Sequence, residues 1–287
     1  MSLSVEQTEQ GKTFLANRAT GHIGLSVAAH DGVTRRSQVH EHGSLRVRFP
    51  NVTDGVLEAV IVNTGGGMTG GDRFTVDMTV GEGARLVAGT TAAEKIYRST
   101  GPAAEMDVTL KVASGARLAW LPQETILFDR ARLSRRIDVD VADGASLIMA
   151  EAVVFGRAAM GEAMAEGAFT DRWRVRLNGK LVYADTAKLD SALPGGAIAA
   201  QLGRRAVAGG GIAMATVLIV PGGDEALEHV RALGDTSPSG FLGEVGISAW
   251  NGVAVARLVA KDGAVLRHDL IALLAALGTQ VPRLWLQ

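Results

Sequence analysis

Carboxylate side chains recur at regular intervals within apolar stretches of this sequence. Glu94, Glu124 and Glu151 each follow one copy of a short repeated phrase, and Asp185 follows a looser fourth copy. A carboxylate is costly to bury unless a cation or several hydrogen bonds compensate its charge. Two interpretations remain open: each acid pairs with a basic side chain of the next repeat, or the acids together line a path for a cation. Basic residues available for such pairs are Lys95, Arg98, Arg130 and Arg157.

The repeated phrase predicts the elements that must position these acids. It is written Val80-Gly-Glu-Gly-Ala-Arg-Leu86, Val112-Ala-Ser-Gly-Ala-Arg-Leu118 and Val141-Ala-Asp-Gly-Ala-Ser-Leu147, with Leu177-Asn-Gly-Lys-Leu181 as the fourth copy. Alternating apolar and polar residues before each copy predict a strand, and each Xaa-Gly pair predicts a hairpin turn. Repeats at such spacing are typical of stacked supersecondary units. We therefore expect the acids to line up along one side of a stack.

Composition favours the same fold class. With 36 glycines and only 5% aromatic residues, many short strands and tight turns are expected. Helices are predicted at Gly223–Leu233 and Asp269–Leu277, each followed by a glycine, whereas the glycine-interrupted segment Ala150–Ala168 predicts a compact loop with helical turns. The prediction is a mainly β protein, in which stacked hairpin repeats form an elongated β-superhelix or two-layer β-domain, with a few helices mostly toward the C-terminus.

The expected organisation has three parts. Residues 1–20 are polar and predict a flexible N-terminal tail. Residues 21–205 hold the repeats and predict the β scaffold, and residues 206–287 are expected to add C-terminal strands and helices packed on the same domain.

Charge and cysteine content exclude several classes of function. The formal net charge of −1 gives no basic field for nucleic acid or an anionic membrane, so neither is expected as a partner. The chain has no cysteine, which excludes disulfides, thiolate metal sites and cysteine nucleophiles. No signal-peptide pattern and no apolar stretch long enough to span a membrane is visible. The sequence thus predicts a cytoplasmic protein.

Two further stretches could carry chemistry. Asn63–Arg73 is dense in glycine but lacks the lysine of a phosphate-binding loop, so it predicts unusual φ angles or close backbone approach instead. His40-Glu-His42 places two imidazoles on one side of a strand, a spacing that metals can use. Because no third ligand is near in the sequence, an ordinary exposed pair is the expectation, and the role of His40 and His42 stays open.

The strand Arg172-Trp-Arg-Val-Arg-Leu177 puts three arginines on one face. A solvated strand face is favoured over a strip that binds a partner. No Gly-x-Ser-x-Gly, His-Glu-x-x-His or comparable motif supports nucleophilic catalysis.

Five stretches taken together resemble the urease accessory protein UreD family, called UreH in some organisms. They are Gly66-Gly-Met-Thr-Gly-Gly-Asp-Arg73, Thr91-Ala-Ala-Glu-Lys-Ile-Tyr-Arg-Ser99, Trp120-Leu-Pro-Gln-Glu-Thr-Ile-Leu-Phe-Asp129, Phe155-Gly-Arg-Ala-Ala-Met-Gly-Glu162 and Leu181-Val-Tyr-Ala-Asp185. The likeness covers residues 40 to 190 strongly and the remainder in outline. One departure is Val62-Asn63-Thr64, where many members carry His-Pro-Pro or a similar string.

The resemblance implies a scaffold for nickel insertion and not an enzyme. Such proteins bind UreF, which recruits the GTPase UreG, and the assembly docks on the urease structural subunits; a dimer within this complex is left open. The resemblance implies no tightly bound cofactor, only transient Ni²⁺ on an internal path with weak, replaceable oxygen ligands. The candidate nickel-path acids are Asp72, Glu94, Glu124, Glu151 and Asp185.

Two alternatives come from other classes. A carbohydrate-active enzyme on stacked β units would need two acids that face one open cleft, such as Glu124 and Asp129. A metal-independent interaction module would use the glycine-rich loop and the arginine strand to bind protein.

Overall fold

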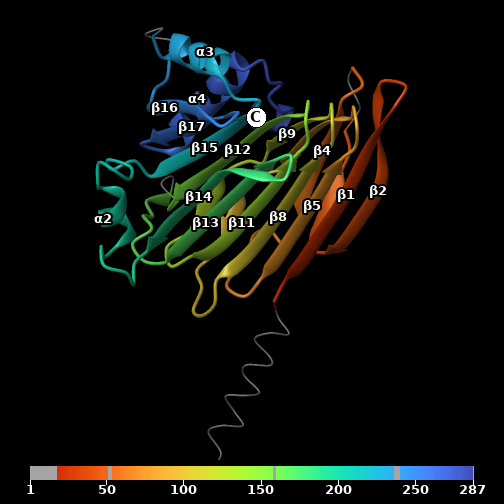
Figure 1. The fold of residues 1–287 in the computed structure, drawn as a ribbon. Helices are drawn as coiled ribbons and strands as arrows, with labels where there is room; N and C mark the ends of the chain where they lie inside the picture. The colour runs from red at the N-terminus through yellow and green to blue at the C-terminus, as the bar shows by residue number, and fades with distance from the viewer. Residues whose placement is uncertain (1–17, 51–53, 158–159, 236–239, 287) are drawn as a thin grey trace, which may run out of the picture.

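The computed structural model describes residues 18–50, 54–157, 160–235 and 240–286. Within these ranges the strands form two sheets, and helices lie mostly toward the C-terminus (Figure 1). The mainly β, two-layer stacked fold predicted from the repeats is confirmed. The predicted tail at residues 1–20 falls almost wholly outside the described residues, and the first strand begins at Thr20.

A seven-stranded sheet forms the front layer in Figure 1, in the order β14-β13-β11-β8-β5-β1-β2. From β13 to β1 neighbouring strands run parallel, whereas β2 and β14 run antiparallel at the two edges. Its strands are β1 (Thr20–His30), β2 (Val33–Gly43), β5 (Arg73–Val80), β8 (Ala104–Val112), β11 (Arg132–Val141), β13 (Ala168–Leu177) and β14 (Lys180–Asp190).

A ten-stranded sheet lies behind it, in the order β16-β17-β15-β12-β9-β6-β4-β3, with β10 and β7 joined beside β12. Strands β4, β6, β9 and β12 pair in parallel, and the strands beyond them at either end pair antiparallel. Its strands are β3 (Leu45–Arg48), β4 (Leu57–Asn63), β6 (Arg85–Thr90), β7 (Glu94–Ile96), β9 (Arg117–Leu121), β10 (Thr125–Leu127), β12 (Ser146–Phe155), β15 (Ala213–Val220), β16 (Glu244–Trp250) and β17 (Val253–Ala260).

The first three repeated phrases form arches between the sheets. The phrase at Val80–Leu86 leaves β5 in the front sheet and enters β6 in the rear sheet, and the next two copies do the same from β8 to β9 and from β11 to β12. The prediction of hairpins at these positions is wrong. A glycine with positive φ suits either connection, and each flanking strand pairs in parallel with its equivalent in the next repeat instead of folding back on its neighbour.

Stacking of the arches explains why the phrase is repeated with so little change in sequence. Gly83, Gly115 and Gly144 all have φ near +65°, at 65°, 65° and 67°. The amide of Ala116 donates to the carbonyl of Ala113 across the turn at 3.0 Å, and equivalent bonds close the other two arches. The alanine after each glycine is buried between the layers. A positive φ and a small side chain are thus required at the same two positions of every copy.

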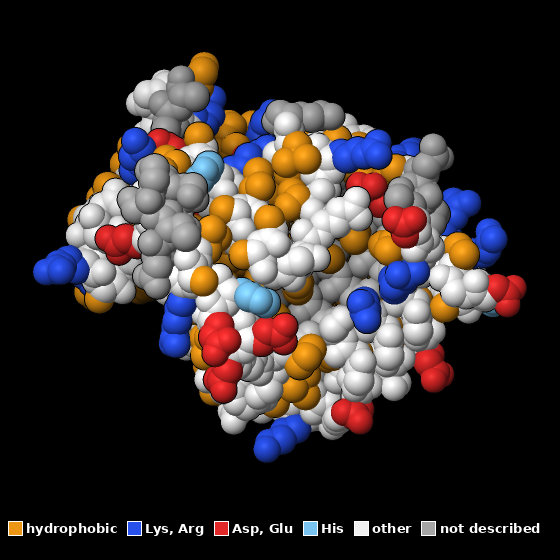
Figure 2. All heavy atoms as spheres, turned by 90° about the horizontal axis from the view of Figure 1, so that it is seen from above, with side chains coloured by type: hydrophobic (Ala, Val, Ile, Leu, Met, Phe, Trp, Pro, Cys, Tyr) orange, Lys and Arg blue, Asp and Glu red, His pale blue; other side chains and the backbone are white. Residues whose placement is uncertain are grey.

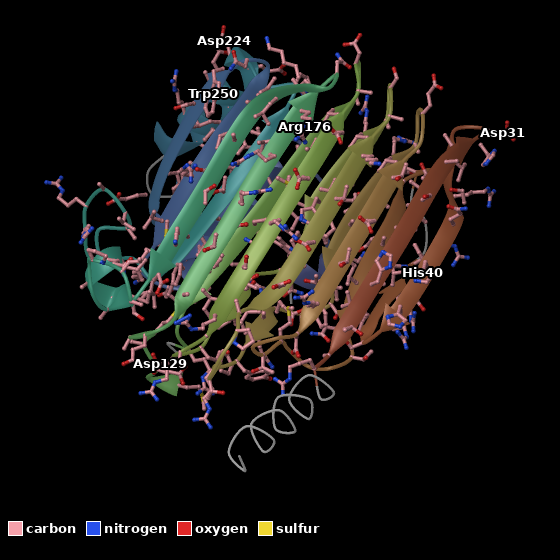
Figure 3. All side chains as sticks on the ribbon, turned by 60° about the horizontal axis from the view of Figure 1, so that its bottom comes forward. Asp31, His40, Asp129, Arg176, Asp224 and Trp250 are labelled. Carbon is pink, nitrogen blue, oxygen red and sulfur yellow. The ribbon has the colours of Figure 1, made fainter. Side chains whose placement is uncertain are left out.

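The fourth copy forms a true hairpin. Asn178 and Gly179 both have positive φ, and β13 and β14 pair antiparallel on either side of them. The arginine row of β13 faces outward from the front sheet, and Arg176 can be followed on that face in Figure 3.

Two hydrophobic clusters stabilise the layers. The larger fills the space between the two sheets, where Val80, Val112 and Val141 form one buried row across β5, β8 and β11. The second lies on the other side of the rear sheet, where α4 packs against β15 and β17. The helices are α2 (Ile198–Leu202), α3 (Asp224–Asp235), α4 (Gly263–Ala276) and the 3-10 helix η2 (Arg283–Leu286).

The helix predictions are confirmed with one shifted start. Helix α3 covers the predicted Gly223–Leu233 segment. Helix α4 begins six residues before the predicted Asp269, because the carboxylate of Asp262 accepts a hydrogen bond from the Val265 amide at 2.8 Å and caps the helix N-terminus.

The loop predicted at Ala150–Ala168 is wrong in its first part. Strand β12 continues to Phe155, and it is buried on both faces because sheet strands cover one side and α4 lies on the other. A strand buried on both faces shows no period-two alternation, so the pattern that marks the other strands is absent there.

Hydrophobic side chains also reach the surface. On the face seen from above, they gather near the middle, with charged side chains toward the periphery (Figure 2). Among the described residues, the exposed large apolar side chains include Leu242, Trp250 and Leu286 of the C-terminal part.

The arches predict a matched pair of glycine variants. A Cβ at Gly115 or at Gly101 would meet nothing within 4 Å, but only Gly115 has a positive φ. We expect Gly115→Ala to lower the free energy of unfolding by about 1–2 kcal/mol relative to Gly101→Ala, because alanine is strained in the left-handed region. Urea unfolding followed by circular dichroism measures both. Equal stability of the two variants would show that the arches tolerate other backbone conformations.

Candidate functional site

A buried ion cluster joins the two sheets in the interior of the stack. Strand β11 places Arg135 inward, β13 places Asp171 beside it, and β12 of the facing sheet places Glu151 opposite. The Arg135 guanidinium donates to Asp171 at 3.0 and 2.6 Å and also to Glu151. The indole Nε1 of Trp120 donates to Glu151 at 2.7 Å. All four side chains lie in the core, with Arg135 only 1% exposed.

Charge pairing within the cluster opposes the effect of burial. Burial acts to lower the pKa of Arg135, but the charges of Asp171 and Glu151 raise it above its ordinary value. Burial pushes the pKa of Glu151 upward, against the attraction of Arg135. Breaking such a group leaves an uncompensated charge in the core. The cluster therefore fixes how the two sheets lie against each other.

A second ion pair bridges the sheets near their edge. Asp185 of β14 accepts from Arg257 of β17 at 2.6 Å and from the Tyr183 hydroxyl at 3.2 Å. Burial acts to raise the pKa of Asp185, but the hydrogen bond and charge of Arg257 hold it below its ordinary value. Burial also raises the pKa of Tyr183.

A cavity of about 500 Å³ lies between these two groups. Its walls come from β13 and β14 on one side and from β12, β15 and β17 on the other. The charged side chains that line it are Glu151, Asp171, Asp185, Lys188 and Arg257. Three carboxylates therefore line one half-open cavity between the sheets, and two of them, Glu151 and Asp185, are candidates from the sequence analysis.

The remaining candidate acids lie apart from this cavity. Glu124 pairs with Arg267 of α4 at 2.8 and 2.7 Å, which ties the segment after the second repeated phrase to the C-terminal helix. Buried Asp72 accepts from the amides of Ala19 and Thr69 at 2.8 and 2.7 Å, and so holds the glycine-rich loop against the start of β1.

The glycine-rich loop itself behaves as predicted. Gly66 and Gly71 have positive φ, and a Cβ at Gly67 would lie 2.6 Å from the Lys95 carbonyl oxygen. Special backbone angles and close approach are thus the reasons for these glycines.

Glu94 is the one candidate acid with a strongly shifted pKa and an amide as its partner. Asn63 Nδ2 donates to Glu94 Oε1 at 2.9 Å. Burial raises the pKa of Glu94 to about 7, against the opposing effect of that hydrogen bond. The partner is Asn63 of the Val62-Asn63-Thr64 stretch that the sequence analysis singled out.

The ion pairs favour the first interpretation of the acids in part. The cations for Glu151, Asp185 and Glu124 are Arg135, Arg257 and Arg267, and the expected basic residues do not serve them. Arg130 instead pairs with Asp129 and Glu166, and Arg157 with Glu162. Among the described residues, no group of three or more His, Asp or Glu side chains lies in ligating geometry.

Sequence reasoning missed Arg135 and Asp171. A signal was present, because both stand at positions where the alternation of their strands calls for an apolar residue, in Leu133-Ser-Arg-Arg-Ile137 and Phe169-Thr-Asp-Arg-Trp173.

The paired acids of the carbohydrate alternative gain no support. Glu124 is bound by Arg267, and Asp129 Oδ1 accepts the amides of Ala165 and Glu166 at 2.8 and 3.0 Å. Both carboxylates are thus engaged in structural contacts, Glu124 with helix α4 and Asp129 with the backbone before β13.

No helix in the described part of the chain is long and apolar enough to cross a membrane.

Stacked strands in two sheets joined by arches, with carboxylates and arginines held between the sheets, define a β-solenoid-like fold. Residues 19–286 match the UreD urease accessory protein family. A urease accessory protein UreD of Rhodopseudomonas palustris (strain HaA2) is 58% identical over 95% of this chain and 95% of its own length. One from Bradyrhizobium diazoefficiens is 55% identical over 95% and 96%. The chain belongs to the UreD family of urease accessory proteins, which gives it a role in urease maturation.

The ion cluster predicts a strong contrast between two neighbouring arginines. Arg135→Met leaves Glu151 and Asp171 buried without their cation, and we expect it to cost about 3–5 kcal/mol of stability. Arg136→Met removes only an exposed pair with Asp107, and we expect a loss of about 0–1 kcal/mol. Urea unfolding compares the two, and the soluble fraction on expression serves if Arg135→Met does not fold. Similar behaviour of both variants would contradict the role of the cluster.

Glu94 predicts a pH-dependent stability. Its folded pKa of about 7 lies above the ordinary 4.5, so the folded state holds the proton more tightly and the free energy of unfolding falls as pH rises through this range. We expect Glu94→Gln to match the wild type at pH 4.5 or below and to be more stable at pH 8. Thermal melts at both pH values measure this. A constant difference between the variants across the range would refute the raised pKa.

Proposed function

We propose that this chain is the scaffold through which urease receives nickel. With UreF and the GTPase UreG it docks on the apo-urease subunits, and Ni²⁺ passes through an acid-lined path between its two sheets. The single observation that carries the proposal is the cavity faced by Glu151, Asp171 and Asp185 in a chain of the UreD family.

The ligand chemistry supports passage over storage. Carboxylate oxygens hold Ni²⁺ less tightly than imidazole or thiolate ligands do, so they can exchange along a path. Arg135 competes with any cation for Glu151 and Asp171, which further disfavours a tight internal site.

Asp185 is the proposed first contact for nickel at the cavity. Its side chain and that of Arg257 are 31% and 51% exposed, whereas those of Glu151 and Asp171 are 3% and 10% exposed. A cation that enters here meets Asp185 first and must displace the Arg257 guanidinium from it. Glu94, with a neutral partner, is a second proposed contact.

The proposed UreF surface is the C-terminal part of the chain. The exposed apolar side chains of Leu242, Trp250 and Leu286 are the kind that a partner would cover. The assembly would form in the cytoplasm. Two such assemblies could pair into a dimer.

Co-expression of the urease structural subunits with UreF and UreG tests the proposal. At limiting nickel we expect omission of this chain to abolish urease activation. Asp185→Asn should lower activation several-fold while UreF is still captured, because the amide keeps the shape but loses the charge that attracts Ni²⁺. Urease activity and a UreF pull-down are measured on the same cells.

Asp138→Asn is the matched control. Asp138 lies on the outer face of the front sheet, 3.6 Å from Arg176 and away from the cavity. Urease activation with Asp138→Asn should therefore equal activation with the wild type. Unchanged activation without this chain would refute the proposed function. If Asp185→Asn loses both UreF binding and urease activation, the role of that carboxylate is structural. If Asp185→Asn activates urease normally, the cavity is not part of the nickel path.

A further inference from the structure

Three of the six histidines of the chain come together on the outer face of the front sheet. In the antiparallel pairing of β1 with β2, His22 stands directly opposite His42, and His40 stands opposite Gly24. The inward neighbours Ile23 and Leu25 are buried, so these histidines share the opposite, outward face. Figure 3 shows His40 on that face. The third imidazole that sequence analysis lacked is therefore His22, supplied by the neighbouring strand.

The His22 and His40 side chains meet beside Gly24. A Cβ at Gly24 would lie 3.4 Å from the His40 Cβ and 3.9 Å from His22 Nε2, so the His22 ring extends over the glycine. The ring centroids of His22 and His40 are 5.0 Å apart. Two imidazoles that bind one ion through bonds of about 2.1 Å at a tetrahedral angle hold their centroids about 5 Å apart. The observed spacing is compatible with a ligand pair, but the rings have to rotate before their nitrogens face one ion, because no group of three or more such side chains among the described residues has ligating geometry as it stands.

Asp77 of β5 fixes the state of the His22 ring. Its carboxylate lies 2.9 Å from His22 Nε2, and an ionised carboxylate only accepts, so Nε2 carries the proton. The lone pair of His22 is then on Nδ1, the nitrogen left to bind an ion. A carboxylate that orients a metal-binding histidine in this manner is common in metal sites.

We infer that His22, His40 and His42, with Asp77 as the orienting partner, form a binding site for a late first-row divalent metal ion such as Zn²⁺, Ni²⁺ or Cu²⁺. Imidazole suits these ions, and the absence of thiolates makes a nitrogen site the strongest ligand set that the chain can offer. His40 and His42 are exposed, so they can rotate into ligating geometry at little cost. This site lies on the outside of the front sheet and differs from the carboxylates of the internal cavity.

Titration of the tag-free full chain with Zn²⁺ and, separately, Ni²⁺ by isothermal calorimetry tests the site. We expect one tight binding event that His40→Ala weakens by more than tenfold and that Asp77→Asn weakens by about 10–100-fold. His30→Ala is the matched control. His30 is exposed and lies on the same strand as His22, eight residues and about 26 Å farther along it. Asp185→Asn is the control for the cavity. Circular dichroism melts verify that every variant is folded.

Binding that survives in His40→Ala, or that is lost equally in His30→Ala, would overturn the inference. Loss in Asp185→Asn with retention in His40→Ala would locate the ion in the cavity and would also overturn it. The electron paramagnetic resonance spectrum of the Cu²⁺ complex should show nitrogen hyperfine coupling from fewer imidazoles in His40→Ala than in the wild type. None of these measurements involves urease, so the site stands or falls independently of the proposed function.

Discussion

Parallel, in-register pairing of equivalent strands is the constraint on which the rest of this structure depends. Leu86 pairs with Leu118 and Leu118 with Leu147, while in the other sheet Val80, Val112 and Val141 form a matching row. Between the sheets, each repeat therefore buries its apolar residues mainly against its neighbours. A charged side chain at an inward position must likewise pair with a residue of a neighbouring strand or of the facing sheet. Arg135 meets Asp171 in its own sheet and Glu151 in the other.

The contacts of the candidate acids link distant parts of the chain. Glu124 and Arg267 are separated by 143 residues, and Asp185 and Arg257 by 72. Both pairs attach the C-terminal strands and helix to the repeats. Electrostatic pairing, in addition to apolar burial, thus joins the late segments to the early ones. Asp185, which borders the proposed nickel path, is also one of the residues that hold the two sheets together.

Much of this arrangement can be predicted from short sequence patterns. The repeated phrase predicts the stack, the glycines predict positive φ, and the helix at Asp224–Asp235 is marked by its apolar spacing. Two features are not local. Whether a Xaa-Gly turn forms an arch or a hairpin depends on which strands pair, and Gly83 has the same φ that a hairpin would need. The cation that neutralises Glu124 lies on a helix that begins more than a hundred residues later. Likewise, His40 and His42 gain His22 only through strand pairing.

The antiparallel strands at the ends of the sheets have a consequence for the size of the molecule. Parallel repeats have no inherent limit, because the last one presents the same edge as the first. Here β2 and β14 reverse direction at the two edges of the front sheet, as β3 does at one edge of the rear sheet and β16 at the other. These reversed strands act as terminal caps. A further parallel unit, or the stack of a second molecule, would meet an edge whose hydrogen-bonding pattern does not continue its own. The length of the scaffold is therefore set by its caps.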